Sequence, residues 1–153
     1  MNIRYDMVWC YVVRSNSHGV HEILQLRRAQ GEYLAGIWQT VVGGIKTPET
    51  AAQAALRELR EETDLVPLEF YQLDTVNTFF IAGKDAIFHC PGFCALVDPE
   101  AGITLNHEHD ALRWITREQI EQSFLWPGER AQLAELCREI LDEGPAKSVL
   151  RIQ

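Results

Sequence analysis

A glycine pair followed by a helix-forming segment restricts the backbone structure that this part of the chain can adopt. Residues 43–65 read GGIKTPETAAQAALRELREETDL. Thr50 and Gln53 have the spacing of a capping box, in which each side chain satisfies a free backbone N–H of the first helical turn. We expect a helix from this box to about Thr63, with one apolar face for packing on a sheet. The residues of that face are Ala52, Ala55, Leu56 and Leu59.

Most of the remaining sequence alternates between strand and turn signals. Residues 4–14 and 21–28 flank the turn SNSHG and predict a hairpin. Residues 37–42 predict a third strand, which the glycine pair stops. Further strands are expected at 69–81, 86–97 and 111–115, and further helical segments at 117–123 and 128–142. The order predicts an α/β (α+β) domain, in which helices flank a mixed β-sheet.

Length and charge restrict the number of domains and the kind of partner. The chain has 153 residues, which is typical of one domain, so we expect residues 1–153 to form a single domain. The formal net charge of −8 disfavours a nucleic acid duplex as partner, because binding phosphates requires a basic surface. No apolar run is long enough for a membrane span, and the first ten residues lack a signal-peptide pattern. We therefore expect no membrane partner and a cytoplasmic location.

The four cysteines predict buried free thiols. They show neither paired Cys-x-x-Cys spacing nor the density of a disulfide scaffold. Cys90 and Cys94 lie near His89 in the sequence, and His107 and His109 follow, which raises the alternative of zinc. Structural zinc sites normally repeat ligand spacings of two to four residues, and this sequence does not.

The charged half of the predicted helix points to a metal site. Glu58, Glu61 and Glu62 stand at positions i, i+3 and i+4, so their carboxylates leave one side of a helix and approach a common point. Three like charges repel one another unless a cation lies among them. Mg2+ prefers hard oxygen ligands and binds through a few carboxylates together with substrate phosphates. The plain alternative is a solvated helix face with i,i+4 ion pairs.

The wider segment resembles the Nudix box, G-x5-E-x7-R-E-U-x-E-E-x-G-U, where U is apolar. The matching residues are Gly43, Glu49, Arg57, Glu58, Leu59, Glu61, Glu62 and Leu65. The penultimate glycine is replaced by Asp64, which tolerates the left-handed backbone of a helix end less well than glycine does. The glycine pair also follows Val42 rather than a proline, so either glycine can hold the register. The resemblance implies a Nudix-type α/β/α sandwich and cleavage of a nucleoside diphosphate linked to another group.

The resemblance also implies roles for the residues of the box. Glu61 and Glu62 are expected as the principal Mg2+ ligands, with Mn2+ as an alternative ion, and Glu58 as ligand or catalytic base. Arg57 is expected to orient these carboxylates. Glu49 is expected either to support the metal ligands without touching the ion or to bind a further ion. A backbone carbonyl near Gly43 is a candidate for completing the coordination of the metal. Bound metal would neutralise phosphoryl oxygens and activate water near neutral pH.

Four residues outside the box are candidates for catalysis or substrate binding. Glu108 lies where some members recruit an additional acidic residue, as ligand or general base, against the alternative of a solvated loop carboxylate. Arg28 is a candidate phosphate contact, and otherwise an exposed arginine. Trp38 and Gln39 are candidate substrate contacts, although Trp38 fits a core position as well. His107 and His109 flank Glu108 and receive no role.

The stretch WQTVVGG is similar to the dihydroneopterin triphosphate pyrophosphatase and dATP pyrophosphohydrolase branch of the family. We therefore expect an Mg2+-dependent pyrophosphohydrolase that releases pyrophosphate and a monophosphate from a nucleoside or pterin triphosphate. One alternative is hydrolysis of ADP-ribose, a nucleotide sugar or a dinucleoside polyphosphate. Another is a module that binds nucleotides without catalysis, against which the complete set of box carboxylates argues. The resemblance leaves a homodimer open.

Overall fold

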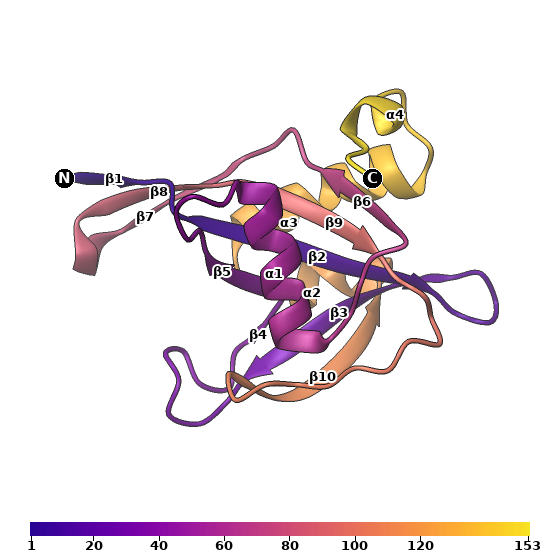
Figure 1. Ribbon diagram of the computed structural model, residues 1–153, viewed down its shortest axis with the longest axis horizontal. Coiled ribbons are helices and arrows are strands. Elements are labelled where there is room, and N and C mark those ends of the chain that lie inside the picture. The colour runs from indigo at the N-terminus through magenta and orange to yellow at the C-terminus, as the bar shows by residue number, and fades with distance from the viewer.

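The computed structural model describes residues 1–153 and has the layered fold that the sequence predicts (Figure 1). The strands are β1 Asn2–Arg4, β2 Met7–Ser15, β3 His21–Arg28, β4 Trp38–Gln39, β5 Val41–Gly44, β6 Glu69–Gln72, β7 Asn77–Ile81, β8 Ala86–Cys90, β9 Gly92–Leu96 and β10 His109–Thr116. The helices are α1 Ala51–Thr63, α2 Ile120–Ser123, α3 Pro127–Glu135 and α4 Lys147–Leu150, with 3-10 turns at Ala82–Lys84 and Arg117–Gln119 and a π-helix at Leu136–Leu141. None of these helices is long and apolar enough to span a membrane.

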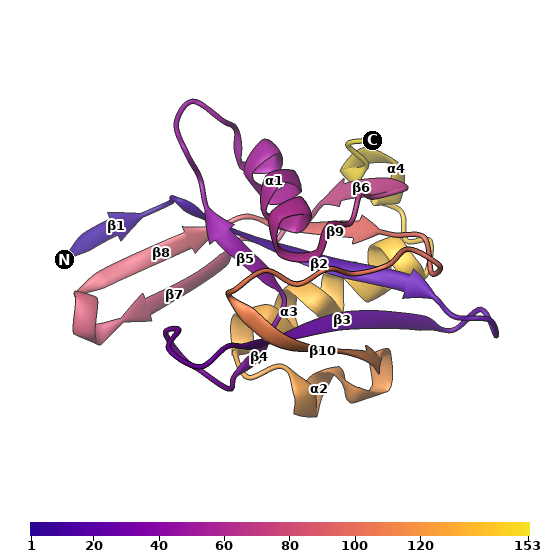
Figure 2. The ribbon, with the colours of Figure 1, turned by 60° about the horizontal axis from the view of Figure 1, so that its bottom comes forward.

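Two mixed sheets organise the strands. The larger sheet runs in the order β10-β3-β2-β9-β6, with β4 paired to β3 and β5 paired to β2. The smaller sheet runs β1-β8-β7 and extends from one end of the molecule (Figures 1 and 2). Two pairings, β2 with β9 and β1 with β8, are parallel, and the others are antiparallel. The predicted hairpin is confirmed, because Val13 of β2 pairs with Ile23 of β3.

The central strand β2 supplies side chains to both layers of the core. Val8, Cys10 and Val12 belong to the apolar cluster that includes Leu59 of α1. The alternate residues of β2 belong to the second cluster, which includes Leu133 of α3. Successive strand residues point to opposite faces, so one strand serves two helical layers. Helix α1 accordingly covers one face of the large sheet, and α2 and α3 cover the other (Figure 2).

Helix α1 begins and ends where the sequence predicts. The Thr50 side chain accepts a hydrogen bond from the Gln53 backbone N–H, and the Gln53 side chain accepts one from the Thr50 backbone N–H. At the other end, Asp64 adopts φ of 63° and ψ of 16°, and its N–H donates to the carbonyl of Arg60. The aspartate therefore takes the left-handed conformation for which the Nudix box normally has glycine.

Two predicted long strands are wrong in their continuity. The segment 69–81 divides into β6 and β7, and the segment 86–97 divides into β8 and β9. Pro91 separates β8 from β9 and has no N–H to continue a ladder. The two halves pair in different sheets, because β8 joins β1 and β7 whereas β9 lies between β2 and β6. The chain crosses from the small sheet to the large one at this proline.

The strand predicted before helix α1 is also interrupted. β4 and β5 are separated at Thr40, whose hydroxyl donates a 2.6 Å hydrogen bond to the carbonyl of Cys10. The prediction that the glycine pair stops the strand is wrong. Both glycines lie within β5, where Gly43 pairs with Val8 and Gly44 with Met7. Likewise the segment 4–14 contains the end of β1 and most of β2, with a break between them.

The helical segments near the C-terminus are confirmed. Residues 117–123 form a 3-10 turn followed by α2. Of the predicted segment 128–142, residues 128–141 lie in α3 and the π-helix that continues it, and Asp142 follows the last helical residue. Pro127 occupies the first turn of α3, where its missing N–H costs no intrahelical bond. Strand β10 is three residues longer than the predicted segment 111–115, and α4 was not predicted. The four cysteines are free, and all but Cys137 are buried.

Candidate metal centre

The contact between Glu58 and strand β5 requires glycine at position 43. A Cβ atom built on Gly43 would lie 2.0 Å from Cδ of Glu58, far inside any real contact distance. A Cβ atom on Gly44 would meet nothing closer than the carbonyl oxygen of Asp6 at 3.7 Å. The absence of a side chain at Gly43 therefore lets the Glu58 carboxylate lie against the strand.

Three carboxylates from two parts of the chain converge next to this contact. Glu58 and Glu62 are one turn apart on α1, and Glu108 lies in the turn immediately before β10. One ligand atom from each of the three lies within 4.8 Å of the others. Asn106 helps to place Glu108, because its amide donates to Oε2 at 3.3 Å and its carbonyl oxygen accepts from the Glu108 N–H at 3.0 Å. We call this group the Glu58–Glu62–Glu108 cluster.

Glu62 is the most deeply buried carboxylate of the cluster. Its side chain is fully inaccessible, and neither carboxylate oxygen has a hydrogen-bond partner. Burial, together with the negative charges of Glu108 and Glu58, raises the pKa of Glu62 to about 10. A buried carboxylate without partners is costly, and a cation among its neighbours would offset that cost.

Burial and Arg57 shift the pKa of Glu58 in opposite directions. Burial raises the pKa of the Glu58 carboxyl, while the hydrogen bond and charge of Arg57 lower it, and the net direction is upward. The guanidinium N–H donates to Oε1 of Glu58 at 2.8 Å. Arg57 therefore fixes one oxygen of this carboxylate.

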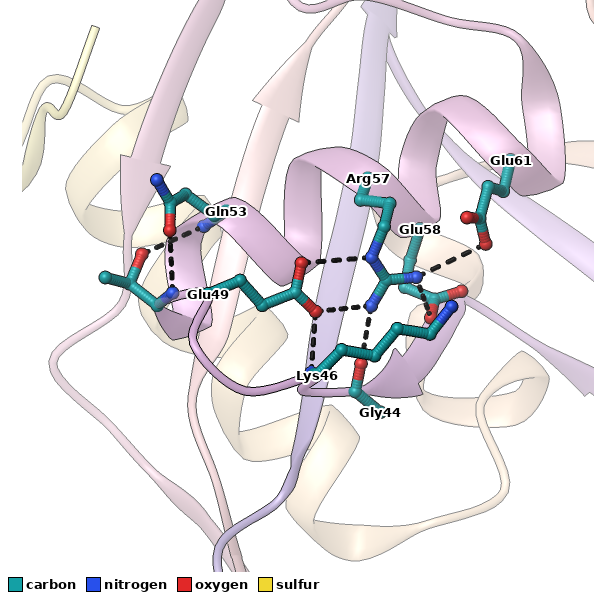
Figure 3. A network of polar contacts seen from close by, with 8 residues as sticks. Gly44, Lys46, Glu49, Gln53, Arg57, Glu58 and Glu61 are labelled. Atoms are coloured by element: carbon teal, nitrogen blue, oxygen red, sulfur yellow. Dashed lines mark hydrogen bonds and ion pairs between the residues drawn. The ribbon is translucent and has the colours of Figure 1, made fainter.

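Arg57 connects strand β5 and the segment that follows it to the acidic side of α1 (Figure 3). It donates two hydrogen bonds to Glu49, at 3.0 and 2.6 Å, and one to the carbonyl of Gly44 at 2.7 Å. A further N–H donates to Glu61 at 3.3 Å. A rigid guanidinium fork can hold several acceptors in a fixed arrangement, which a lysine cannot do. The side chain thus fixes the distance between strand β5 and the helix.

The structure separates the predicted ligands into two groups. Glu58, Glu62 and Glu108 come together, with Gly43 beneath Glu58. Glu61 does not join them, because its i,i+4 spacing brings it to Arg57, and 48% of its side chain is exposed.

Glu49 lies on the far side of Arg57 from the cluster and also accepts a hydrogen bond from the Lys46 N–H at 2.7 Å (Figure 3). The hydrogen bonds from Arg57 lower the pKa of Glu49 to about 2. Glu49 is therefore ionised at neutral pH and serves as the counter-charge of Arg57.

Arg28, the predicted phosphate contact, lies at the end of β3. Its guanidinium donates to the carbonyl of Tyr33 at 3.1 Å and pairs with Glu32 at 3.4 Å, both in the loop that follows. Its positive charge lowers the pKa of Glu62 against the larger effect of burial. Arg28 therefore places a cationic group beside the acidic cluster.

The two predicted substrate contacts of β4 have protein partners. The guanidinium of Arg113 lies 4.2 Å from the centre of the Trp38 ring, and that of Arg27 lies 5.8 Å away. The amide nitrogen of Gln39 lies 3.2 Å from Nε2 of His109. Each side chain thus contacts a neighbouring strand, and a stacked ligand would have to share the Trp38 ring with arginine.

His109 lies at the site, although the sequence analysis gave it no role. It begins β10 next to Glu108, its side chain is fully buried, and its Nδ1 lies 3.4 Å from Oε1 of Glu62. Burial and the charge of Arg28 lower the pKa of His109 to about 4, so the ring is neutral at physiological pH. Only its position beside Glu108 could have indicated a role, because a histidine in a loop is more often solvated.

The donor set fits a hard divalent cation such as Mg2+ or Mn2+. It consists of carboxylate oxygens, and the most buried of them lack any hydrogen-bond partner. Mg2+ characteristically binds through one or two carboxylates and completes its shell with water and substrate phosphates. The cluster thus has the kind of oxygen ligands that such a cation takes.

Comparisons with known proteins found a matching family profile and similar sequences. A NUDIX domain profile matches residues 5–136. An octanoyltransferase of Myxococcus xanthus is 36% identical over 107 residues, which cover 68% of this chain but only 29% of that protein. The nucleoside triphosphatase NudI of Enterobacter sp. (strain 638) is 24% identical over 125 residues, covering 77% of this chain and 86% of the relative.

A solved structure supports the fold. A Listeria monocytogenes protein described as a NUDIX hydrolase superimposes with a TM-score of 0.75 at 24% identity, covering 92% of this chain and 97% of the other. At this identity the likeness concerns the fold alone. The profile match spans most of the chain and includes every residue of the Glu58–Glu62–Glu108 cluster. The chain therefore belongs to the NUDIX domain family and is a member of the Nudix hydrolases.

Proposed function

We propose that this protein is a divalent-metal-dependent pyrophosphohydrolase, which cleaves a nucleoside or pterin triphosphate into a monophosphate and pyrophosphate. The observation that carries the proposal is the Glu58–Glu62–Glu108 cluster, in which a buried carboxylate without hydrogen-bond partners lies beside two others. A polyphosphate substrate is anionic and would be repelled by this cluster alone. The reaction therefore needs a cation, for which the cluster provides hard oxygen ligands.

The protein residues have distinct roles in the proposed reaction. Glu58 and Glu62 of α1 would hold the cation, and Glu108, in the turn before β10, would hold it as well or accept the proton of the attacking water. A bound Mg2+ supplies neutralisation of the phosphoryl oxygens and activation of water near neutral pH. Arg57 keeps Glu58 in position through its 2.8 Å hydrogen bond. Arg28 adds positive charge for the phosphate chain.

The base is either Glu58 or Glu108, and the structure favours Glu108. Arg57 occupies one oxygen of Glu58, and that side chain is buried, so water has little access to it. The carboxylate of Glu108 is half-buried and receives a single 3.3 Å hydrogen bond from Asn106. A water molecule can reach it more easily, and proton acceptance needs such access.

Two observations support a triphosphate as substrate. The nucleoside triphosphatase NudI is similar to this chain over 86% of its own length. The segment WQTVVGG, which carries Trp38 and Gln39, forms β4 and β5 and is similar to the branch that acts on dihydroneopterin triphosphate and dATP. The branch and the physiological substrate are part of the proposal.

The test is an analysis of products with added Mg2+. Nucleoside triphosphates, dihydroneopterin triphosphate, ADP-ribose, a nucleotide sugar and a dinucleoside polyphosphate are each incubated with the protein, with and without inorganic pyrophosphatase. We expect phosphate to appear from one of the triphosphates only when pyrophosphatase is present. Two monophosphates without pyrophosphate, from any other substrate, would contradict the proposed reaction and favour hydrolysis of a nucleoside diphosphate linked to another group.

Glu62→Gln serves as the matched control for this assay. The substitution keeps the shape of the buried side chain and removes the ligand charge, so turnover should fall by a factor of about 10² or more. Equal turnover of Glu62→Gln and the unmodified protein would show that the activity does not depend on the cluster. Binding of nucleotide without hydrolysis would identify a binding module instead.

A further inference from the structure

Gln39 and His109 form a polar pair that the proposed reaction does not use. His109 is 3% exposed and its side chain is fully buried between β4 and α1. One ring nitrogen, Nε2, lies 3.2 Å from the amide nitrogen of Gln39, and the other, Nδ1, lies 3.4 Å from Oε1 of Glu62. The side chains of His109 and Glu62 are buried and that of Gln39 is half-buried. Burying polar side chains is costly unless their polar atoms satisfy one another.

The contact with Gln39 determines which ring nitrogen carries the proton. The side-chain nitrogen of glutamine is a donor only. His109 can accept that hydrogen bond only if Nε2 carries no proton, so the ring is neutral and its proton is on Nδ1. Strand β4 holds Gln39 in place through the register that pairs it with Leu26 of β3. Gln39 of β4 thus determines the tautomer of His109.

The protonated nitrogen faces the carboxylate that has no other partner. Nδ1 of His109 and both oxygens of Glu62 are buried and make no hydrogen bond within ordinary geometric limits. The 3.4 Å separation between Nδ1 and Oε1 is short enough for a small rotation of either side chain to form one. Such a bond through Oε1 leaves Oε2 of Glu62 for a cation.

We propose that His109 is a positioning residue, whose Nδ1–H, fixed by Gln39, orients the Glu62 carboxylate toward the cation that Glu58 and Glu108 share. The inference rests on the proposed function, because it assumes that the cluster holds a cation. It also gives Gln39 a role other than substrate contact. Residues that orient a metal ligand typically change metal affinity by 10- to 100-fold when they are replaced.

The first experiment measures the tautomer of His109 by 15N NMR of the imidazole nitrogens in the unmodified protein. The chain has five histidines, so the signals of His109 are assigned by their loss in His109→Leu. We expect an Nδ1-protonated neutral ring at neutral pH. An Nε2-protonated ring would overturn the proposal, because Nδ1 would then have no proton to direct at Glu62.

The second experiment measures Mn2+ affinity by electron paramagnetic resonance. In Gln39→Glu the new carboxylate accepts a hydrogen bond from Nε2–H, which should place the proton of the neutral ring on Nε2 instead of Nδ1. Mn2+ affinity should then fall by about 10- to 100-fold, although an added negative charge by itself would raise it. His109→Leu should show a similar loss, and His109→Gln, which retains an N–H donor, should recover part of it. Unchanged affinity in Gln39→Glu and His109→Leu would overturn the proposal.

His89 provides a matched control. It is also a strand histidine with a side-chain hydrogen bond, at 2.9 Å to Thr78, but it lies on β8 away from the cluster. His89→Leu should leave Mn2+ affinity unchanged, and an equal loss in that variant would show that the effect at His109 is a general loss of fold. Unmodified protein that binds Mn2+ without hydrolysing any triphosphate would contradict the proposed function alone. Hydrolysis with unchanged affinity in the His109 variants would contradict the positioning role alone.

Discussion

At the scale of single residues, the site depends on how buried carboxylates are compensated. Arg57 compensates Glu49 and Glu58 by direct hydrogen bonds, whereas Glu62 has no such partner. The first two carboxylates are therefore structurally satisfied within the protein. Glu62 is the residue that gains most from a cation, which is why we assign it the leading role in metal binding.

Replacement of Arg57 by lysine tests the importance of its fork. Lysine keeps the positive charge but cannot donate to Glu49, Glu58 and the Gly44 carbonyl at the same time. We expect Arg57→Lys to lower turnover about 10²-fold, because the misplaced carboxylate holds the cation less well. Steady-state kinetics at saturating Mg2+ measure this, and turnover within twofold of the unmodified protein would show that charge alone suffices.

A second buried carboxyl, Glu129 of α3, predicts how stability depends on pH. Burial raises the pKa of Glu129 to about 7 from an ordinary value of 4.5. Below pH 4.5 both folded and unfolded chains hold this proton, and between pH 4.5 and 7 the unfolded chain releases it first, so stability falls as pH rises. We expect Glu129→Gln, which stays neutral, to stabilise the protein by about 1 to 3 kcal/mol at pH 8 and to have no effect at pH 4. Urea unfolding at both pH values measures the difference, and an equal effect at both would refute the assignment.

At the scale of elements, the site is the meeting point of strand β5, helix α1 and the turn before β10. The residues of the box fix the first two, which is why the sequence predicts Glu58 and Glu62 together with the glycine beneath them. The third carboxylate, Glu108 in the turn before β10, was predictable only by resemblance, since no local pattern brings it to α1. The sequence could not predict that Glu61 lies apart from the cluster. Glu61 is three residues after Glu58, which allows a shared cation, and four after Arg57, which allows an ion pair equally well.

The close approach of α1 to β5 gives a prediction with an internal control. Gly43→Ala would place a Cβ atom 2.0 Å from Cδ of Glu58, so the carboxylate must move and Mn2+ affinity should fall at least 10-fold. Gly44→Ala meets its nearest atom, the Asp6 carbonyl oxygen, at 3.7 Å and should bind Mn2+ normally. The same titration applied to both variants decides which glycine holds the register of the box. Equal effects would indicate a shifted loop.

At the scale of the whole molecule, one mixed sheet carries both the core and the site. Helix α1 covers one face and α3 the other, and the smaller sheet extends beyond them (Figure 2). The sequence predicted the layers and the end of α1 because alternation, capping and helical spacing are local signals. It did not predict that two long strand segments are shared between two sheets, because the exchange at Pro91 depends on which strands are available as neighbours.

The most direct test of the account is to locate the cation itself. Crystals of the protein soaked in Mn2+ would give an anomalous difference peak at the manganese position. We predict a peak between the carboxylates of Glu58, Glu62 and Glu108, and no such peak in Glu62→Gln. A peak on the Arg57 side of α1, held by Glu49 or Glu61 and unaffected by Glu62→Gln, would contradict the assignment of this cluster as the metal centre.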